Sequence, residues 1–430
     1  MTARRLVAVA SAIAVLGAFP AAGAAATRAT PSVVIYRDGV EDPEALTSSL
    51  EHKLGLGVNY RYDAAVDGFA GNLTDAQVEA LKSNPDVASV EPDKTFTAAG
   101  LVPTASGEAV QPGVRRIAAA SKTQVHEAAD VGVAILDTGI DLANTDLNAA
   151  NGKNCISATK SANDDNGHGT HVAGIVAARN NGSGVAGVAP GTKLYSVKVL
   201  NARGSGTLSQ ILCGIDWVTA NADALNIKVA NMSLVGPGAN DDKCGYLIVD
   251  SQHRAICKST AAGVSYVAAA GNSAMSFGTT IPAAYPEVLT ATAMSDTDGA
   301  AGGVGAAPSC KKGERDDRYA TYSNFAVTAS QQDHAVAAPG TCVVSDKPGG
   351  GVATYYGTSQ AAPHVAGTVA LCLGNGGTAG PCKGLTSAAI IQKIRGDAAA
   401  TATPSNGFVG DPLAPVIGKY FGSLVAAGGY

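Results

Sequence analysis

Four short segments of the chain contain the residue types that acyl-transfer chemistry requires. They are VGVAILD, NGHGTHVAG, VSYVAAAGN and GTSQAAPHVAG, which hold Asp137, His168, Asn272 and Ser359. A serine hydroxyl is a weak nucleophile, so Ser359 needs a neighbouring base, and His168 can take its proton. Asp137 can fix the imidazole tautomer and balance its charge once it is protonated. The Asn272 amide and the Ser359 backbone N–H can stabilise a tetrahedral oxyanion.

Each of these residues also has an ordinary structural interpretation. An aspartate after a strand, a histidine near a helix start and an asparagine after glycine are common turn or cap residues, and serine is a favoured N-cap. The combination of the four segments, rather than any one of them, favours catalysis.

The elements around these residues predict an α/β fold. Apolar, β-branched segments recur from about residue 115, among them VGVAILD, KLYSVKVL, VANMSLV and VSYVAAAGN. Such strands are typical of a mostly parallel central sheet that is buried on both faces. Alanine-rich helical segments alternate with them, which places helices on both faces of the sheet. Functional residues gather at the carboxyl ends of strands in such sheets, and Asp137 and Asn272 stand at strand ends.

Residues 1–26 have the layout of a secretory signal peptide. Arg4 and Arg5 precede an apolar segment from Leu6 to Phe19, and small residues follow up to Ala26. The alternative, a membrane anchor, requires about 18–20 apolar residues, and this segment is shorter. We therefore expect a secreted, extracellular protein without a membrane partner.

All eight cysteines lie in the second part of the chain, from Cys155 onward. Export to an oxidising compartment predicts that they form disulfides. A zinc site would need ligand pairs two to four residues apart, and the sequence has no such pair. The simplest pairing joins neighbours along the chain, as Cys155–Cys213, Cys244–Cys257, Cys310–Cys342 and Cys372–Cys382.

Residues 31–97 form a segment of different character, without cysteine. Its pattern predicts strand, helix, strand, helix and strand, and Thr74 followed by Gln77 indicates a capping box at the second helix. Residues 98–107 are small and weakly patterned, which predicts an exposed linker that a protease can cut. Residues 108–430 then make up the α/β domain.

The segments AILDTGI, NGHGTHVAG, AAAGN and GTSQAAPHVAG resemble those of the subtilisin-like serine proteases, the subtilases of peptidase family S8. The resemblance extends over most of residues 115–400, and the chain order Asp, His, Ser is that of subtilisin. It implies that Asp137, His168 and Ser359 form the catalytic triad and that Asn272 is the oxyanion donor.

The segment 31–97 resembles the I9-type inhibitory pro-domain of the same family, a small α+β ferredoxin-like fold. The resemblance implies a serine endopeptidase that is made as a zymogen, with its own pro-domain as an intramolecular inhibitor. We expect the enzyme to cut its own precursor within residues 98–107. Parallel sheets of high contact order fold slowly, which gives a physical reason for a folding template.

The resemblance further implies that a peptide substrate binds as an added strand between residues 204–208 and 233–238. Subtilases commonly have glycine where Val235 stands, so we expect a narrowed P1 pocket that prefers small to medium apolar residues. No acidic cluster marks these segments, which argues against a demand for paired basic residues. The expected substrate-binding residues are Gly204, Ser205, Gly206, Ser233, Leu234, Val235, Gly236, Ala269, Ala270, Gly271 and Thr280.

A structural Ca2+ site is also implied by the resemblance. Asp146 follows Asp137 by nine positions, as in members that bind calcium strongly, and the loop RNNGSGV has the length of their calcium loop. The alternative, that these asparagines and glycines only form a turn, stays open. The expected hard oxygen ligands come from Asp146 and Asn181 and from the carbonyls of Arg179, Ser183 and Val185.

One departure from the family lies beside the nucleophile. Gln360 stands where the family usually has methionine. Because the position takes no part in proton transfer, we expect activity to survive. The change removes an oxidisable thioether, which predicts resistance to peroxide.

Other function classes fit the sequence less well. The net charge of −5 without a basic patch argues against nucleic acid as a partner. An esterase of the G-x-S-x-G type is disfavoured, because the chain reads GTSQA around Ser359. A catalytically inactive peptide-binding protein would have lost a triad residue, and none is missing. We expect a monomer that acts on proteins or peptides.

Overall fold

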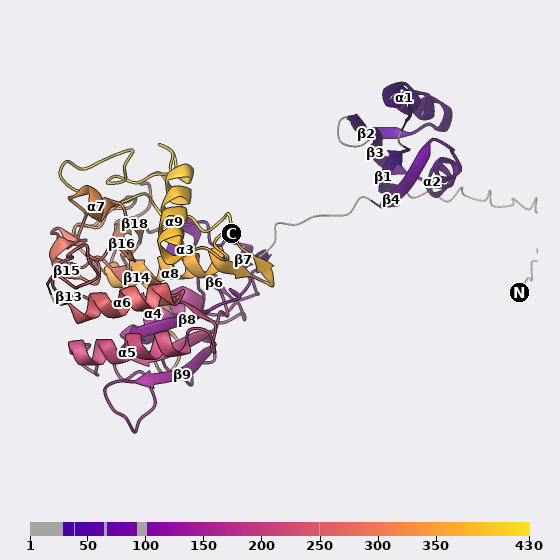
Figure 1. Ribbon diagram of the computed structural model, residues 1–430. Coiled ribbons are helices and arrows are strands. Elements are labelled where there is room, and N and C mark those ends of the chain that lie inside the picture. Colours follow the sequence, from indigo (N-terminus) through magenta and orange to yellow (C-terminus); the bar gives the residue numbers. More distant parts are fainter. Residues whose placement is uncertain (1–28, 38, 64–66, 93–100, 249) are drawn as a thin grey trace, which may run out of the picture. The chain divides into compact units, whose positions relative to one another are not determined.

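The computed structural model describes residues 29–37, 39–63, 67–92, 101–248 and 250–430 (Figure 1). The predicted signal peptide, and residues 98–100 of the predicted linker, lie outside the described residues. The chain divides into two compact units, residues 1–97 and 98–430, each of which is described by itself. Among the described residues, no helix is long and apolar enough to cross a membrane.

The first unit is an antiparallel sheet of four strands in the order β2-β3-β1-β4. Its elements are β1 (Thr30–Tyr36), α1 (Pro43–Leu54), β2 (Gly57–Asp63), β3 (Asp67–Leu73), α2 (Asp75–Lys82) and β4 (Val87–Pro92). The prediction of one strand between the helices was wrong, since β2 and β3 form a hairpin there. The two strands pair antiparallel, with Gly57 opposite Asn72.

Apolar side chains from both helices and the sheet form the core of this unit. Val34, Phe69 and Leu73 come from the strands, while Leu50 and Leu81 come from the helices. The capping box that the sequence predicted at Thr74 is present, with reciprocal hydrogen bonds between Thr74 and Gln77. The βαββαβ order therefore agrees with the predicted α+β fold.

The second unit is built on an eight-stranded sheet, and all its strand pairs are parallel except that of the short edge strand β17 (Arg318–Tyr319) with β16. The order is β17-β16-β14-β12-β8-β11-β9, and β18 also pairs with β16. The parallel strands are β8 (Gly132–Asp137), β9 (Ala149–Asn154), β11 (Leu194–Lys198), β12 (Ile227–Met232), β14 (Ser265–Ala269), β16 (Val288–Ser295) and β18 (Ala335–Pro339). The prediction of a mostly parallel sheet is confirmed.

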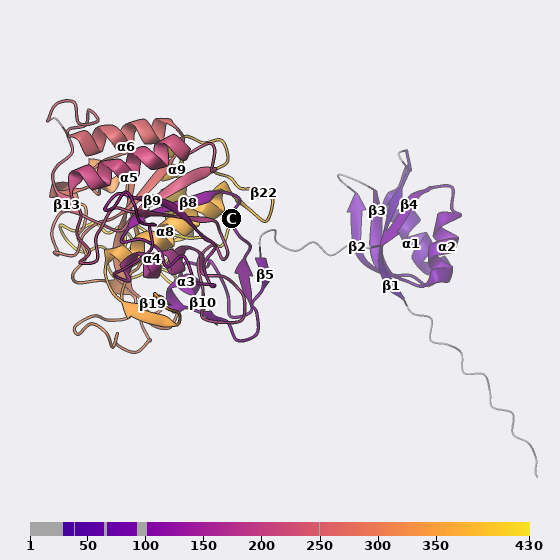
Figure 2. The ribbon, with the colours of Figure 1, turned by 90° about the horizontal axis from the view of Figure 1, so that it is seen from below.

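Helices cover both faces of this sheet, as Figures 1 and 2 show. Along β8, Val133 and Ile135 pack in one apolar cluster with α4 (His168–Ala177), α8 (Thr358–Leu373) and α9 (Ser387–Thr401). The alternate residues Ala134 and Leu136 pack in a second cluster with α5 (Leu208–Asn221) and α6 (Ser251–Ala261). Burial of alternate residues on opposite faces explains why the strand is apolar throughout.

Short elements complete the second unit. They are β5 (Leu101–Pro103), β6 (Ala109–Val110), α3 (Pro112–Arg116), β7 (Gln124–His126), β10 (Val185–Ala186), β13 (Gly236–Pro237), the 3-10 turn Phe277–Thr279, β15 (Thr280–Ile281), α7 (Ala329–Gln332), β19 (Val343–Asp346), β20 (Val352–Tyr355), β21 (Gly374–Asn375) and β22 (Thr378–Ala379).

All eight cysteines are paired in four disulfides. The pairs are Cys155–Cys213, Cys244–Cys257, Cys310–Cys342 and Cys372–Cys382, which is the predicted pairing of neighbours. The disulfide framework is thus confined to the second unit.

Candidate active site

Asp137 and His168 meet at the carboxyl edge of the sheet. Asp137 is the last residue of β8 and is fully buried, while His168 is the first residue of α4. His168 Nδ1 lies 2.8 Å from Asp137 Oδ1. The close approach requires Gly169, since a Cβ there would lie 2.1 Å from the carbonyl oxygen of Gly139. Gly167, on the other side of His168, has a φ of 108°, a conformation that favours glycine.

The ionisation of His168 is controlled by this contact. Burial alone would lower the pKa of His168, but the charge and the hydrogen bond of Asp137 outweigh it and raise the pKa above its ordinary value. The imidazolium is therefore stabilised where it forms. This is what a general base needs when it takes a proton from a serine.

Asp164 fixes the start of α4 and was not singled out from the sequence. Its carboxylate accepts hydrogen bonds from the backbone N–H groups of Asn166, Gly167 and Thr170 and from the hydroxyls of Thr138 and Thr170. Burial alone would raise the pKa of Asp164, but these hydrogen bonds outweigh it and lower the pKa. The acidic residue before the NGHGT segment was the signal that could have identified it.

Ser359 lies in the first turn of α8 and is held against Ser233. Ser359 Oγ donates to the carbonyl oxygen of Ser233 at 3.2 Å, and Ser233 Oγ donates to the carbonyl oxygen of Ser359 at 2.8 Å. The hydroxyl is thus bonded to Ser233 here rather than to His168, although both Ser359 and His168 line the same cleft. Catalytic hydrogen bonds are often formed only once substrate is bound.

Asn272 is oriented by the residue before the nucleophile. Its Oδ1 accepts hydrogen bonds from Thr358 N at 2.8 Å and from Thr358 Oγ1 at 3.0 Å. The amide nitrogen is thereby left free to donate elsewhere, and Asn272 lines the cleft. Gly357 makes room for it, because a Cβ at this position would lie 3.2 Å from Asn272 Nδ2.

A cleft of about 750 Å3 joins these residues to the segments expected to bind substrate. Of the expected residues, seven line it, namely Gly204, Ser205, Gly206, Ser233, Leu234, Val235 and Gly236. Thr207, Leu208 and Pro237 of the two expected segments line it as well. Sequence reasoning missed eight lining residues outside those segments, namely Thr138, Asn166, Leu200, Arg203, Ile211, Gln252, Ile281 and Thr358.

The remaining expected residues lie behind the wall of the cleft. Ala269, Ala270, Gly271 and Thr280 are buried and do not line it. The amide of Asn324 occupies the space beside them, since a Cβ on Gly271 would lie 2.4 Å from Asn324 Nδ2. No motif in the sequence marked Asn324 for this place.

Comparison with known proteins agrees with this geometry. The model of the subtilase family, Peptidase S8, matches residues 128–407, and that of peptidase inhibitor I9 matches residues 37–99. The chain belongs to the subtilase family. It is a serine endopeptidase of the subtilisin type with an I9 pro-domain.

Three relatives show how far the similarity extends. Subtilisin E from Bacillus subtilis (strain 168) is 37% identical over 314 residues, which are 72% of this chain and 71% of that protein. Subtilisin DY from Bacillus licheniformis is 40% identical over 255 residues, 59% of this chain and 80% of that protein. Alkaline elastase YaB from Bacillus sp. (strain YaB) is 34% identical over 337 residues, 78% of this chain and 76% of that protein.

The subtilase has a cluster of carboxylates where calcium ligands were expected. Asp146 Oδ1 accepts a hydrogen bond from Asn181 Nδ2 at 2.8 Å. Glu108 Oε2 accepts from the backbone N–H groups of Asn181 and Gly182. Asp346 of β19 lies beside Asp146, and both face Gly184, whose Cβ would lie 2.5 Å from Asp146 Oδ2 and 3.9 Å from Asp346 Oδ1. Glu108 and Asp346 were not predicted.

The pKa values of all three carboxylates are raised. Burial raises the pKa of Asp346 to about 8, and the charge of Asp146 adds to the shift. Burial likewise raises the pKa of Asp146 and of Glu108. In the described part of the chain, no ion pair joins the three to a lysine or arginine, and Asp346 Oδ2 and Glu108 Oε1 have no hydrogen-bond partner. Buried oxygens of this kind fit a hard divalent cation.

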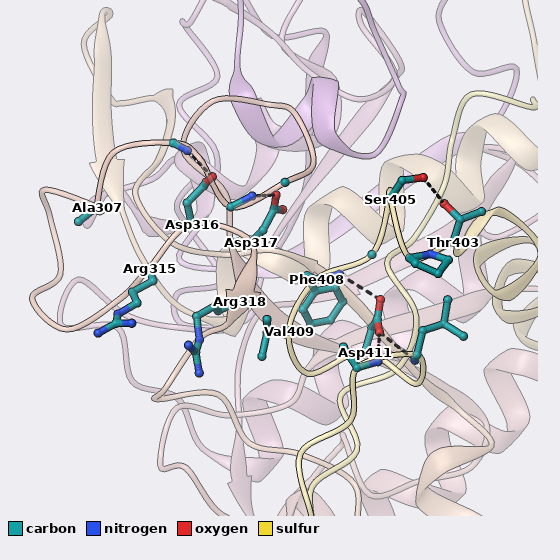
Figure 3. A pocket seen from close by; sticks show the side chains of 17 residues that line it. Ala307, Arg315, Asp316, Asp317, Arg318, Thr403, Ser405, Phe408, Val409 and Asp411 are labelled. Carbon is teal, nitrogen blue, oxygen red and sulfur yellow. Dashed lines mark hydrogen bonds between the residues drawn. The ribbon is translucent and has the colours of Figure 1, made fainter.

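A second cavity of about 750 Å3 lies between residues 302–318 and 403–414 (Figure 3). Its acidic residues already accept hydrogen bonds from the loops that carry them. Asp316 and Asp317 accept from the N–H groups of Gly305 and Gly303, and Asp411 accepts from Phe408 N. This cavity shares no lining residue with the catalytic cleft.

Proposed function

We propose that this subtilase is a secreted endopeptidase of broad specificity that hydrolyses peptide bonds with Asp137, His168 and Ser359 as its triad. The observation that carries the proposal is the convergence of β8, α4 and α8 on one cleft. The 2.8 Å contact of His168 with Asp137 supports the base, and Ser359 stands in the same cleft.

The reaction follows from these positions. Ser359 Oγ leaves its hydrogen bond to Ser233 and attacks the carbonyl carbon of the substrate, while His168 takes the hydroxyl proton. The imidazolium, held by Asp137, then donates that proton to the leaving amine. Asn272 Nδ2 and the backbone N–H of Ser359 donate to the oxyanion of the tetrahedral intermediate. Water, activated by His168, hydrolyses the acyl-enzyme and restores Ser359.

The shape of the cleft supports a preference for small to medium apolar side chains at P1. Val235 carries a side chain where a glycine would leave open space, and it lines the cleft with 51% of its surface exposed. Leu234 and Ile281 add apolar surface. The kcat/KM values for a series of peptides that differ only at P1 measure this preference.

We further propose that calcium binds at Asp146 and stabilises the mature enzyme. The hard oxygen donors are the carboxylates of Glu108, Asp146 and Asp346, together with Asn181. The carbonyls of Arg179, Ser183 and Val185 complete the proposed ligand set. The unpaired buried oxygens of Asp346 and Glu108 support it, and the cation takes no part in the steps above.

The proposed life history is that of an autoprocessed zymogen, cut within residues 98–107, that acts as a monomer. A Ser359→Ala precursor, purified away from other proteases, should remain uncut while the wild type matures. Ser405→Ala is a matched control, because Ser405 is exposed and lines the second cavity. Normal maturation of the pure Ser359→Ala precursor would show that the cut is made by something other than Ser359.

A further inference from the structure

The loop between β13 and α6 is closed on itself by several independent contacts. Asp241 accepts hydrogen bonds from the backbone N–H groups of residues 243, 245, 247 and 248. Burial alone would raise the pKa of Asp241, but these N–H groups outweigh it and hold the pKa below its usual range. Arg254 Nε donates to the carbonyl oxygen of Gly245, and its guanidinium lies 4.4 Å from the ring centroid of Tyr246.

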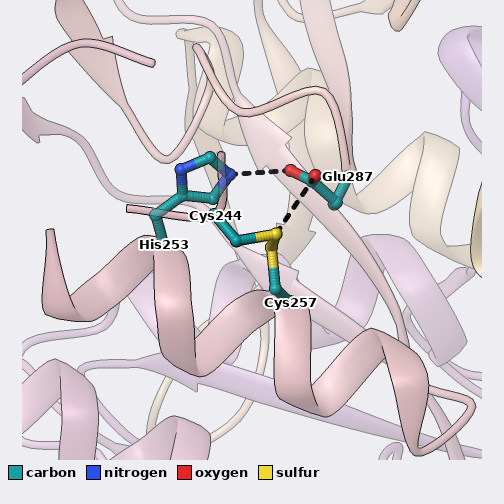
Figure 4. A group of neighbouring side chains, drawn as sticks. All are labelled: Cys244, His253, Cys257 and Glu287. Carbon is teal, nitrogen blue, oxygen red and sulfur yellow. Dashed lines mark hydrogen bonds and ion pairs between the residues drawn. A yellow bond between two sulfur atoms is a disulfide. The ribbon is translucent and has the colours of Figure 1, made fainter. Parts of the chain in front are cut away.

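A second set of contacts fixes the base of this loop to the body of the enzyme. Cys244 is joined to Cys257 of α6 by a disulfide that lies beside His253 and Glu287 (Figure 4). His253 Nε2 lies 2.8 Å from Glu287 Oε2, and its ring stacks on Tyr285 at 4.1 Å. With both sulfurs in a disulfide, this cluster anchors the loop and is no metal site.

The anchored loop exposes three consecutive large apolar side chains. Tyr246 is 63% exposed, Leu247 70% and Ile248 53%, and we call these three residues the apolar loop tip. Single exposed apolar residues are common on proteins, but a contiguous group is typical of a binding surface. Here the backbone that carries the group is held by an aspartate, an arginine and a disulfide, so the exposure is built into the fold.

The loop is continuous with the catalytic cleft at both ends. It leaves the cleft at Pro237 and returns to it at Gln252, and both residues line the cleft. The cleft itself contributes exposed apolar side chains at Leu208 and Val235, 52% and 51% exposed. Exposed apolar side chains therefore stand both in the cleft and on the loop that joins two of its lining residues.

The direction of the cleft determines which part of a substrate reaches the loop. Ser233 contacts Ser359, and residues 234–237 lead from there toward the loop. The proposed P1 side chain lies at Val235, on the loop side of Ser233, so a substrate strand bound along residues 233–236 places the residues before P1 on that side. The chain amino-terminal to the scissile bond thus runs toward the apolar loop tip.

We infer that the apolar loop tip is an auxiliary binding site for an apolar segment of the protein substrate, amino-terminal to the residues held in the cleft. The inference rests on the proposed function, because the binding of substrate in the catalytic cleft determines the direction in which the substrate chain runs. Unfolded protein chains carry such apolar segments, whereas folded surfaces seldom do. The loop would make the enzyme favour long, unfolded, apolar substrates over short peptides.

Matched peptides of different length test this inference. One peptide spans only the cleft. A second carries about six additional amino-terminal residues that include leucine and phenylalanine, and a third carries glycine and serine at those positions instead. An extension of six residues reaches about 20 Å when it is fully extended. For the wild type we expect the apolar extension to raise kcat/KM about tenfold, which corresponds to about 1.4 kcal/mol. The polar extension should change it less than about twofold.

Variants assign the gain to the loop tip. In a Tyr246→Ser, Leu247→Ser, Ile248→Ser protein the gain should fall below about twofold, while kcat/KM for the short peptide stays unchanged. The matched control carries Val304→Ser and Ile417→Ser, 83% and 100% exposed and outside the cleft, and should keep the gain. A gain that persists in the loop variant, or that is absent from the wild type, would overturn the inference.

A binding measurement separates this inference from the proposed function. The Ser359→Ala protein, freed of its pro-domain, is titrated with a fluorescent form of the apolar extended peptide, with and without the three serine substitutions. Tighter binding to the intact loop tip supports the inference independently of the rate of the chemical step, and equal binding refutes it. If the wild type cleaves none of the peptides, the proposed function fails instead.

Discussion

Removal of calcium should destabilise the enzyme if the cation binds where we propose. Three carboxylates, those of Glu108, Asp146 and Asp346, lie together without a paired lysine or arginine among the described residues. A cation bound there stabilises the folded state by RT ln(1 + [L]/Kd), about 2.7 kcal/mol when its concentration is about 100 times Kd.

This free energy converts into a shift of the melting temperature. The second unit spans residues 98–430, and at about 2.1 cal/mol/K for each residue its unfolding entropy is about 0.7 kcal/mol/K. One kcal/mol then changes Tm by about 1.4 °C, so a chelator should lower Tm by about 4 °C relative to calcium.

The assay is thermal unfolding of the mature Ser359→Ala protein, which cannot digest itself, in calcium and in chelator. Asp146→Asn should abolish the difference in Tm. Loss of one carboxylate ligand is expected to weaken calcium binding about tenfold, so Asp346→Asn should reduce the difference in Tm between calcium and chelator by about 2 °C. Asp216→Asn, at an exposed position on α5, should leave it unchanged. A chelator shift below about 1 °C in the parent protein would refute the calcium site.

Three further predictions concern catalysis. Asp137→Asn should lower kcat by about 10,000-fold, as in other serine triads. Asp137 raises the pKa of His168, and only neutral His168 can act as a base. The wild-type rate should therefore rise with pH through a pKa above 6.5. The residual activity of Asp137→Asn should extend to lower pH, because the carboxylate that raises this pKa is gone. The His168–Asp137 contact also stabilises the folded protein while His168 is protonated. This contribution to folding stability is present below pH 6.5 and is lost as the pH rises through the raised pKa. Asn272→Leu should lower kcat by about 100- to 1,000-fold with KM little changed, a value carried over from subtilisin; an unchanged kcat would exclude Asn272 as oxyanion donor. Peroxide should inactivate Gln360→Met but spare the wild type, and equal inactivation would contradict that role for Gln360.

Much of this enzyme could be predicted from local sequence. Most strands of the large sheet, such as β8, β12, β14, β16 and β18, are short apolar segments that are buried on both faces, and a pattern of that kind is visible without the fold. The edge strand β9, with the sequence AANGKN, is partly exposed and shows no such pattern. The four catalytic candidates lie in compact motifs in which glycines precede or follow the reactive residue. The disulfides join cysteines that are neighbours along the chain, so the simplest pairing was confirmed.

Features that depend on distant parts of the chain could not be predicted. Asp346 reaches Asp146 only because β19 returns to the loop after β8, about 200 residues later in the chain. Asn324 fills the wall of the cleft from a loop without a motif. The β2–β3 hairpin, by contrast, could have been predicted, because Asp67-Gly68 at the start of β3 is a dipeptide typical of hairpin turns.

If Ser359 is the nucleophile of an assembled endopeptidase, a serine-directed fluorophosphonate should label it in the mature protein. Peptide mapping should find the label on Ser359, the labelled protein should no longer digest casein, and His168→Ala should take up no label. A folded protein, free of its pro-domain, that digests casein without label on Ser359, or that neither takes up label nor digests casein, would contradict the account.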